Sequence, residues 1–79
     1  MRRSIHSPPY VALRDALTEA RVKAGLTQEQ LAAKLFRPQS YVAKYETGDR
    51  RLDVIELVEL CEHLRVQPVT LLMTIRDAM

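Results

Sequence analysis

Apolar side chains recur every three or four residues along most of the chain, a spacing that is typical of amphipathic helices. The first periodic segment follows Pro8-Pro9 and stops at Gly25, residues that favour the start and the end of a helix. One face of this segment carries Tyr10, Leu13, Leu17, Ala20 and Ala24. No segment alternates with a period of two, so the pattern predicts an all-α fold.

Two further helix starts repeat one arrangement of residues. Thr27 is followed three residues later by Gln30, and Asp53 is followed at the same distance by Glu56. Each pair can form a capping box, in which each side chain accepts a hydrogen bond from the backbone amide of the other residue. Helices are therefore expected to begin next to residues 27 and 53.

Proline residues divide the rest of the sequence. Pro38 separates a short helix that ends at Leu35 from a helix at about 39–47, and Pro68 opens the last helix. The sequence therefore predicts a compact bundle of five short helices. Its expected parts are a tail at residues 1–8, one domain at 9–79, a helix pair at about 27–47, and closing helices at 53–64 and 68–78.

The apolar positions also predict which side of each helix is buried. Val42 and Tyr45 form the apolar side of the helix at 39–47. In the helix that follows, the expected buried positions are Ile55, Leu57, Val58, Cys61 and Leu64. The side chains expected to face solvent there are Glu56, Glu59, Glu62 and His63.

Length and composition restrict the class of protein. The 79 residues suffice for one domain, and a single cysteine, Cys61, excludes an internal disulfide. No apolar run is long enough to span a membrane, the N-terminal residues do not resemble a secretory signal, and the His and Cys spacing offers no zinc site. We therefore expect a small cytoplasmic protein without metal or cofactor.

Charge is divided unevenly along the chain. Residues 1–51 contain ten of the twelve Lys and Arg residues and five of the ten acidic residues, a net charge of +5, whereas residues 52–79 carry −3. A basic region on a protein of low net charge favours a polyanionic partner on one face.

The helix pair at 27–47 has the layout of a helix-turn-helix, because only about three residues separate its two helices. Arg21, the run Gly25-Leu26-Thr27-Gln28-Glu29-Gln30-Leu31-Ala32 and the run from Gln39 to Gly48 resemble the phage-repressor or Cro-type (XRE) helix-turn-helix family. The resemblance covers roughly three quarters of the chain. It implies a lambda-repressor-like domain that binds double-stranded DNA, with the second helix of the pair in the major groove.

The outward side of the helix at 39–47 supplies the candidate base contacts. Gln39 can pair with adenine, Lys44 can donate to guanine, and Ser40 can serve either base. The resemblance places base reading on these three residues, with Ala43 near enough to touch a thymine methyl group.

Candidate phosphate contacts flank this helix. A helix N-terminus attracts anions, and a basic loop follows the helix at 39–47. The candidates are Thr27, Gln28, Tyr41, Arg50 and Arg51, with Arg37 in the turn as a lesser one.

The resemblance also implies an ion pair between Arg21 and Glu46. This pair would fix the helix at 39–47 and leave Arg21 near a phosphate. The alternative is two exposed charges, whose pairing contributes little to stability.

Four positions depart from the family pattern, and one of them is Arg37, which stands where an apolar residue is usual. Phe36 and Arg65 stand where glycine is usual, and Pro38 takes the capping position of the helix at 39–47. Phe36 either enters the core with a shifted turn or adopts a strained left-handed conformation.

These observations predict a sequence-specific DNA-binding transcriptional regulator rather than an enzyme, because Cys61 lacks a base that could activate it. The regulator is expected to repress transcription by binding an inverted-repeat operator as a homodimer. The last helix supplies the expected dimer interface, through Leu71, Leu72 and Ile75 with Met79. The alternative is an antitoxin-like interaction module that binds a partner protein through its acidic C-terminal half.

Overall fold

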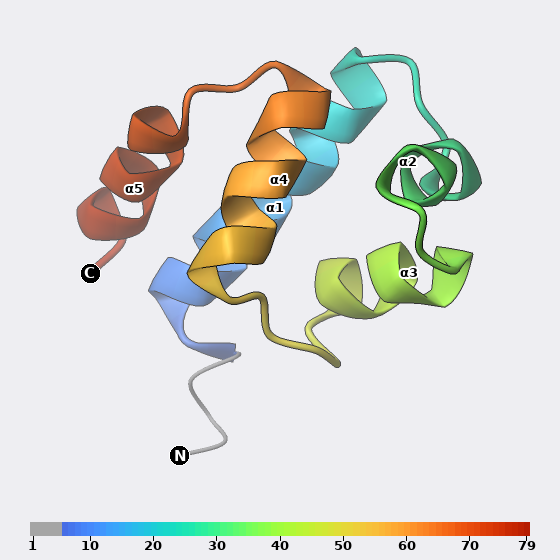
Figure 1. The fold of residues 1–79 in the computed structure, drawn as a ribbon. Coiled ribbons are helices and arrows are strands. Elements are labelled where there is room, and N and C mark those ends of the chain that lie inside the picture. The colour runs from blue at the N-terminus through green and yellow to red at the C-terminus, as the bar shows by residue number, and fades with distance from the viewer. Residues whose placement is uncertain (1–5) are drawn as a thin grey trace.

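The computed structural model describes residues 6–79, which form five helices and no strand (Figure 1). The helices are α1 (Pro8–Lys23), α2 (Gln28–Leu35), α3 (Gln39–Thr47), α4 (Val54–Leu64) and α5 (Pro68–Asp77). The all-α fold that the periodicity predicts is confirmed for these residues. Residues 1–5 of the predicted N-terminal tail lie outside the described residues, and α1 already begins at Pro8.

Two of the helices begin with a capping box. The side-chain Oγ1 of Thr27 accepts from the backbone amide of Gln30 at 3.0 Å, and Oε1 of Gln30 accepts from the amide of Thr27 at 2.9 Å. Asp53 and Glu56 form the same reciprocal pair at 2.8 and 3.0 Å. Because the first turn of a helix leaves its amides without intrahelical partners, these boxes define where α2 and α4 start.

Helices α2 and α4 both end at a residue in the left-handed conformation that is not glycine. Phe36 has a φ of 57° and Arg65 a φ of 58°. Of the two alternatives for Phe36, the structure adopts the strained one, since the Phe36 side chain is 96% exposed and does not enter the core. A Cβ disfavours this conformation by about 1–2 kcal/mol, so the tight turn between α2 and α3 is formed at a cost in stability.

The hydrophobic core lies where α1, α2, α3 and α4 meet. Its fully buried side chains are Leu17, Leu31, Val42, Tyr45 and Leu60. Figure 1 shows α2 and α3 on one side of the α1–α4 pair and α5 on the opposite side. The outer surfaces of α3 and α5 are therefore separated by the body of the domain.

The buried side of α4 differs from the sequence prediction. Ile55 and Val58 are exposed, whereas Glu56 is only 8% exposed. The buried stripe is formed by Leu57, Leu60, Cys61 and Leu64. Its members recur at three- and four-residue spacing, so Ile55 and Val58 fall outside it. Glu56 remains buried at its margin because Arg50 pairs with its carboxylate at 2.7 Å.

Candidate nucleic-acid interface

The side of α3 that faces away from the core is polar. Gln39, Ser40 and Lys44 are exposed, and Ala43 is half-buried. The only carboxylate on α3, that of Glu46, turns towards α1, where Arg21 binds it. A polyanion can therefore approach the outward side of α3 without meeting an acidic side chain of this helix.

Glu46 ties α3 to the first two helices. Arg21 donates to its carboxylate from Nε at 2.8 Å and from Nη2 at 3.1 Å, and donates from Nη1 to the carbonyl oxygen of Leu26 at 2.8 Å. The hydrogen bond to Glu46 raises the pKa of Arg21, which keeps the guanidinium charged. The ion pair that the resemblance implies is thus present. The side chain of Arg21 is largely buried, and each of its three nitrogens donates within the domain. Its phosphate contact stays a prediction.

Gln28 extends this network to the exposed start of α3. Its Nε2 donates to Oε1 of Glu46 at 2.9 Å, and its Oε1 accepts from Nε2 of Gln39 at 2.9 Å. The amide of Gln39 is therefore oriented by a chain of hydrogen bonds that leads back to Arg21. Sequence reasoning missed this role of Gln28. The only indication in the sequence was that two adjacent helices each begin with a glutamine, Gln28 and Gln39.

Arg14 holds the other end of α3. Its Nη1 donates to the backbone carbonyl oxygen of Glu46 at 3.1 Å, in the last turn of the helix. The carbonyl groups of a last turn lack intrahelical partners, so this hydrogen bond caps α3 from a distant part of the chain. Sequence reasoning missed Arg14 as well. Its partner is a backbone carbonyl, which every residue has, so no particular residue type in the sequence marks the contact.

Tyr41 lies in the core rather than on the outward side. Its ring is 7% exposed and meets the ring of Tyr45 edge-on, with centroids 5.7 Å apart, and burial raises its pKa. The guanidinium carbons of Arg37 and Arg50 lie 4.5 and 4.8 Å from the centroid of the Tyr41 ring. The ring of Tyr41 therefore serves as a packing surface for two arginines. The phosphate contact of its hydroxyl stays a prediction.

The remaining candidate phosphate contacts lie on both sides of α3. Thr27 and Gln28 stand at the N-terminus of α2, where first-turn amides and the positive end of the helix dipole attract anions. Arg51 is exposed, and its guanidinium carbon lies 5.4 Å from the centroid of the Tyr10 ring. Arg50, in contrast, donates to both carboxylate oxygens of Glu56 at 2.9 and 2.7 Å.

The expected pairing surface on α5 loses one of its members. Leu72 is 52% exposed and Ile75 is half-buried, but Leu71 is 3% exposed and belongs to the core. Leu71 and Leu72 differ because neighbouring residues on a helix point to different sides. Leu72, Ile75 and Met79 line an apolar groove of about 360 Å³ between α5 and the starts of α1 and α4.

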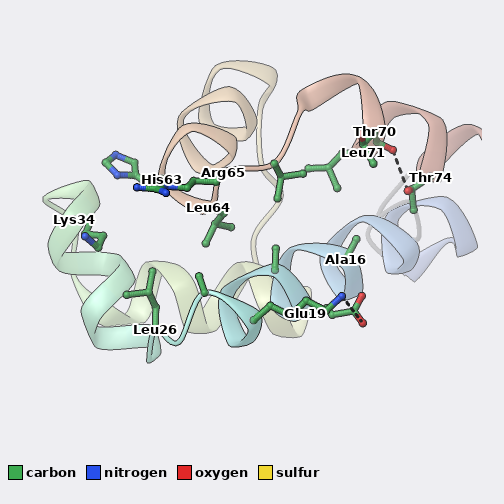
Figure 2. A pocket seen from close by; sticks show the side chains of 14 residues that line it. Ala16, Glu19, Leu26, Lys34, His63, Leu64, Arg65, Thr70, Leu71 and Thr74 are labelled. Carbon is green, nitrogen blue, oxygen red and sulfur yellow. Dashed lines mark hydrogen bonds and ion pairs between the residues drawn. The ribbon is translucent and has the colours of Figure 1, made fainter.

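A wider groove of about 820 Å³ lies between the ends of α1, α2 and α4 and the start of α5 (Figure 2). Lys34, His63 and Arg65 lie at one end of it, and Thr70 and Thr74 lie at the other. No residue of α3 lines this groove, which is therefore separate from the candidate interface. Within residues 6–79, no cluster of His, Cys, Asp or Glu could hold a metal ion, and no helix is long and apolar enough to cross a membrane.

Comparison with known proteins agrees with this geometry. The helix-turn-helix family HTH_3 matches residues 17–71. The fold is similar to the solved structure of an XRE-family like protein from Pseudomonas syringae pv. tomato str. DC3000, with 48% sequence identity and a TM-score of 0.84 over 95% of this chain and 92% of that chain. No curated protein matches the sequence.

The fold and the polar side of α3 define a small DNA-binding domain. The chain belongs to the XRE family of helix-turn-helix proteins. This is a family of DNA-binding regulators and not of enzymes.

Proposed function

We propose that this protein represses transcription by binding an inverted-repeat operator as a homodimer, with α3 of each protomer in the major groove. One observation carries the proposal: α3 exposes Gln39, Ser40 and Lys44. On the inner side of the same helix, Arg14 and Arg21 fix α3 by hydrogen bonds to Glu46. Base reading needs side chains held within hydrogen-bond distance of base edges, and each good pair discriminates by about 1–3 kcal/mol.

Each exposed residue of α3 suits a particular base contact. Gln39 pairs with N6 and N7 of adenine, and its hydrogen bond to Gln28 favours one orientation of its amide. Lys44 donates to O6 or N7 of guanine, and Ser40 serves either base. Ala43 lies beside them on the same helix and packs against a thymine methyl group.

The backbone of the duplex is bound on both sides of α3. Thr27 and Gln28 meet one phosphate at the start of α2, and Arg50 and Arg51 meet another after α3. Each neutralised phosphate adds about 0.9 to the slope of log affinity against log salt. Binding is therefore expected to weaken steeply as salt is raised.

Two protomers are needed because one domain is too small to contact both half-sites of an operator. A single α3 covers one half-site, and two half-sites about 34 Å apart are needed for operator binding. The exposed side chains of Leu72 and Met79, with half-buried Ile75, form an apolar surface on the far side from α3. A protein of this kind is expected in the cytoplasm, on the nucleoid.

Selection from a pool of random duplexes tests the proposal. The protein is expected to enrich one inverted repeat whose half-sites are about one helical turn apart. Enrichment of a lone half-site would exclude the homodimer, and absence of any enriched sequence would exclude sequence-specific binding.

Lys44→Ala tests the base contact, with Lys34→Ala as its matched control. Both lysines are exposed, but Lys34 lies in the last turn of α2 and outside the proposed interface. Lys44→Ala is expected to relax one base position of the operator at a cost of about 1–3 kcal/mol, whereas Lys34→Ala retains the preference. Equal effects of the two variants would reject the assignment of Lys44.

A second candidate is an antitoxin-like module that binds a partner protein. It is favoured by exposed apolar residues on α4 and α5, namely Val54, Ile55, Val58, Leu72 and Met73. Analytical ultracentrifugation of the purified protein separates the two candidates. A dimer that dissociates in Leu72→Glu supports pairing of two copies, whereas a monomer that binds no duplex supports the partner protein.

A further inference from the structure

Four charged side chains surround the start of α3. Arg37 comes from the α2–α3 turn, Arg50 from the loop after α3, and Glu56 and Glu59 from α4. Arg37 Nη1 lies 3.9 Å from Oε2 of Glu56, and Arg37 Nη2 lies 3.5 Å from Oε1 of Glu59. Two positive and two negative charges thus form a neutral cluster, which also encloses the ring of Tyr41.

Glu56 is the centre of this cluster. Both of its carboxylate oxygens accept from Arg50, and the side chain is 11% exposed. The hydrogen bond from Arg50 lowers the pKa of Glu56, so the carboxylate is ionised at neutral pH. The side chains of Arg37 and Arg50 are 34% and 38% exposed, so both arginines still reach the surface beside α3.

We infer that Glu56 is a specificity-determining residue that withholds Arg37 and Arg50 from the DNA backbone. This inference rests on the proposed function. The Glu56 carboxylate occupies the face of the Arg50 guanidinium that Nη1 and Nη2 form, and it offsets the positive charge of Arg50. A phosphate can take this face only by displacing Glu56, whose carboxylate presents the same two-oxygen geometry. A carboxylate within the fold therefore competes with the phosphates of the duplex for the same donors.

The competition acts differently on specific and non-specific complexes. In the operator complex, base contacts from α3 hold the duplex in one position, so a phosphate stays next to Arg50. In a non-specific complex the phosphates are not held in place, and Glu56 keeps its partner. Backbone contacts supply most of the non-specific affinity, so reducing them raises the ratio of specific to non-specific binding.

Glu56→Gln tests the inference in the full-length protein. Glutamine removes the charge and can still accept the amide of Asp53 in the capping box. Affinity for an unselected duplex is expected to rise about three- to tenfold, with a salt slope steeper by about 0.9. Affinity for the selected operator is expected to rise less, which lowers the specificity ratio.

Glu62→Gln is the matched control. It removes one negative charge from the same helix, but Glu62 forms no ion pair with Arg37 or Arg50 in residues 6–79. It is expected to leave the salt slope close to the wild-type value. If the salt slope steepens equally in both variants, the effect comes from the overall charge of the protein, and the role of Glu56 is overturned.

A double-mutant cycle with Arg50→Gln tests whether the effect of Glu56→Gln on DNA affinity depends on Arg50. The cycle is expected to give a non-zero coupling, because Arg50→Gln weakens binding more in the Glu56→Gln protein than in the wild type. Zero coupling, or weaker binding of unselected duplex by Glu56→Gln, would overturn the inference. If the Glu56→Gln protein does not fold, the single variant Arg50→Gln still tests the inference. It is expected to lower the affinity for unselected duplex less than Lys44→Gln does. An equal or larger loss of affinity overturns the inference.

The wild-type measurement separates this inference from the proposed function. Failure of the wild type to bind any duplex would reject the proposed function itself. An enriched operator together with unchanged binding by Glu56→Gln would reject only the role of Glu56.

Discussion

Arg14 lies directly against Gly48, although 34 positions separate them in the sequence. A Cβ on Gly48 would stand 3.1 Å from the guanidinium carbon of Arg14 and 3.3 Å from its Nε. Gly48 also has a φ of 90°, a conformation that glycine adopts without strain. The end of α3 therefore depends on glycine for its backbone conformation and for the close approach of α1.

Gly48→Ala is expected to destabilise the fold by about 2 kcal/mol or more, since backbone strain and contact with Arg14 add. Gly25→Ala is the matched control, because Gly25 also has a positive φ, of 76°, but a Cβ there meets no atom within 4 Å. The control is expected to lose only about 1 kcal/mol. Urea unfolding followed by circular dichroism measures both, and equal losses would contradict the contact.

Phe36→Gly is expected to stabilise the protein by about 0.5–1 kcal/mol, because glycine removes the left-handed strain. Little is lost with the ring, which is almost fully exposed. Phe36→Ala keeps the Cβ and is expected to change the unfolding free energy very little. A loss of stability in Phe36→Gly, measured by the same urea titration, would show that the ring contributes packing.

Arg21→Ala is expected to destabilise the protein by about 2–4 kcal/mol, because it leaves the buried carboxylate of Glu46 without its cation. The two side chains are only 13% and 6% exposed. Lys23→Ala serves as the control, since Lys23 and Glu19 form a pair at 3.9 Å with side chains 76% and 70% exposed. Its expected change in unfolding free energy is below about 0.5 kcal/mol, and similar values for both variants would contradict the buried pair.

Stability is expected to fall in acid partly through Glu56. Its pKa lies below the ordinary value of 4.5 in the folded protein, mainly because Arg50 donates to it. A lowered folded pKa contributes stability that is complete above the unfolded pKa and is lost as the pH falls through the folded value. Unfolding free energies between about pH 6 and pH 3 should therefore decline less steeply for Glu56→Gln than for the wild type. Parallel curves would contradict this contribution.

The helix starts could be predicted from sequence because their causes are local. The Thr27 and Asp53 boxes involve residues three positions apart, and both form with hydrogen bonds of 2.8–3.0 Å. Prediction failed where the neighbours of a side chain come from another segment of the chain. The buried positions of Tyr41 and Glu56 depend on arginines contributed by neighbouring loops, which the period of their own helix does not reveal.

The candidate interface was also predicted only in part, because some of its features have local causes and others depend on distant parts of the chain. The outward positions of Gln39, Ser40 and Lys44 follow from the period of α3 alone. The supports of α3 do not, because Arg14 binds a backbone carbonyl and Gln28 lies eleven residues from Gln39. The Arg21–Glu46 pair was found only through the resemblance, since 25 positions separate its members and any of several charges could have paired.

Because two arginines of α1 hold α3 from its inner side, the outward residues of α3 contribute little to the integrity of the domain. Ser40 and Lys44 can be exchanged for other side chains while the scaffold beneath them persists. Under the proposed function, new operator preferences can therefore arise in descendants of this protein through a few surface substitutions, without an intermediate that fails to fold.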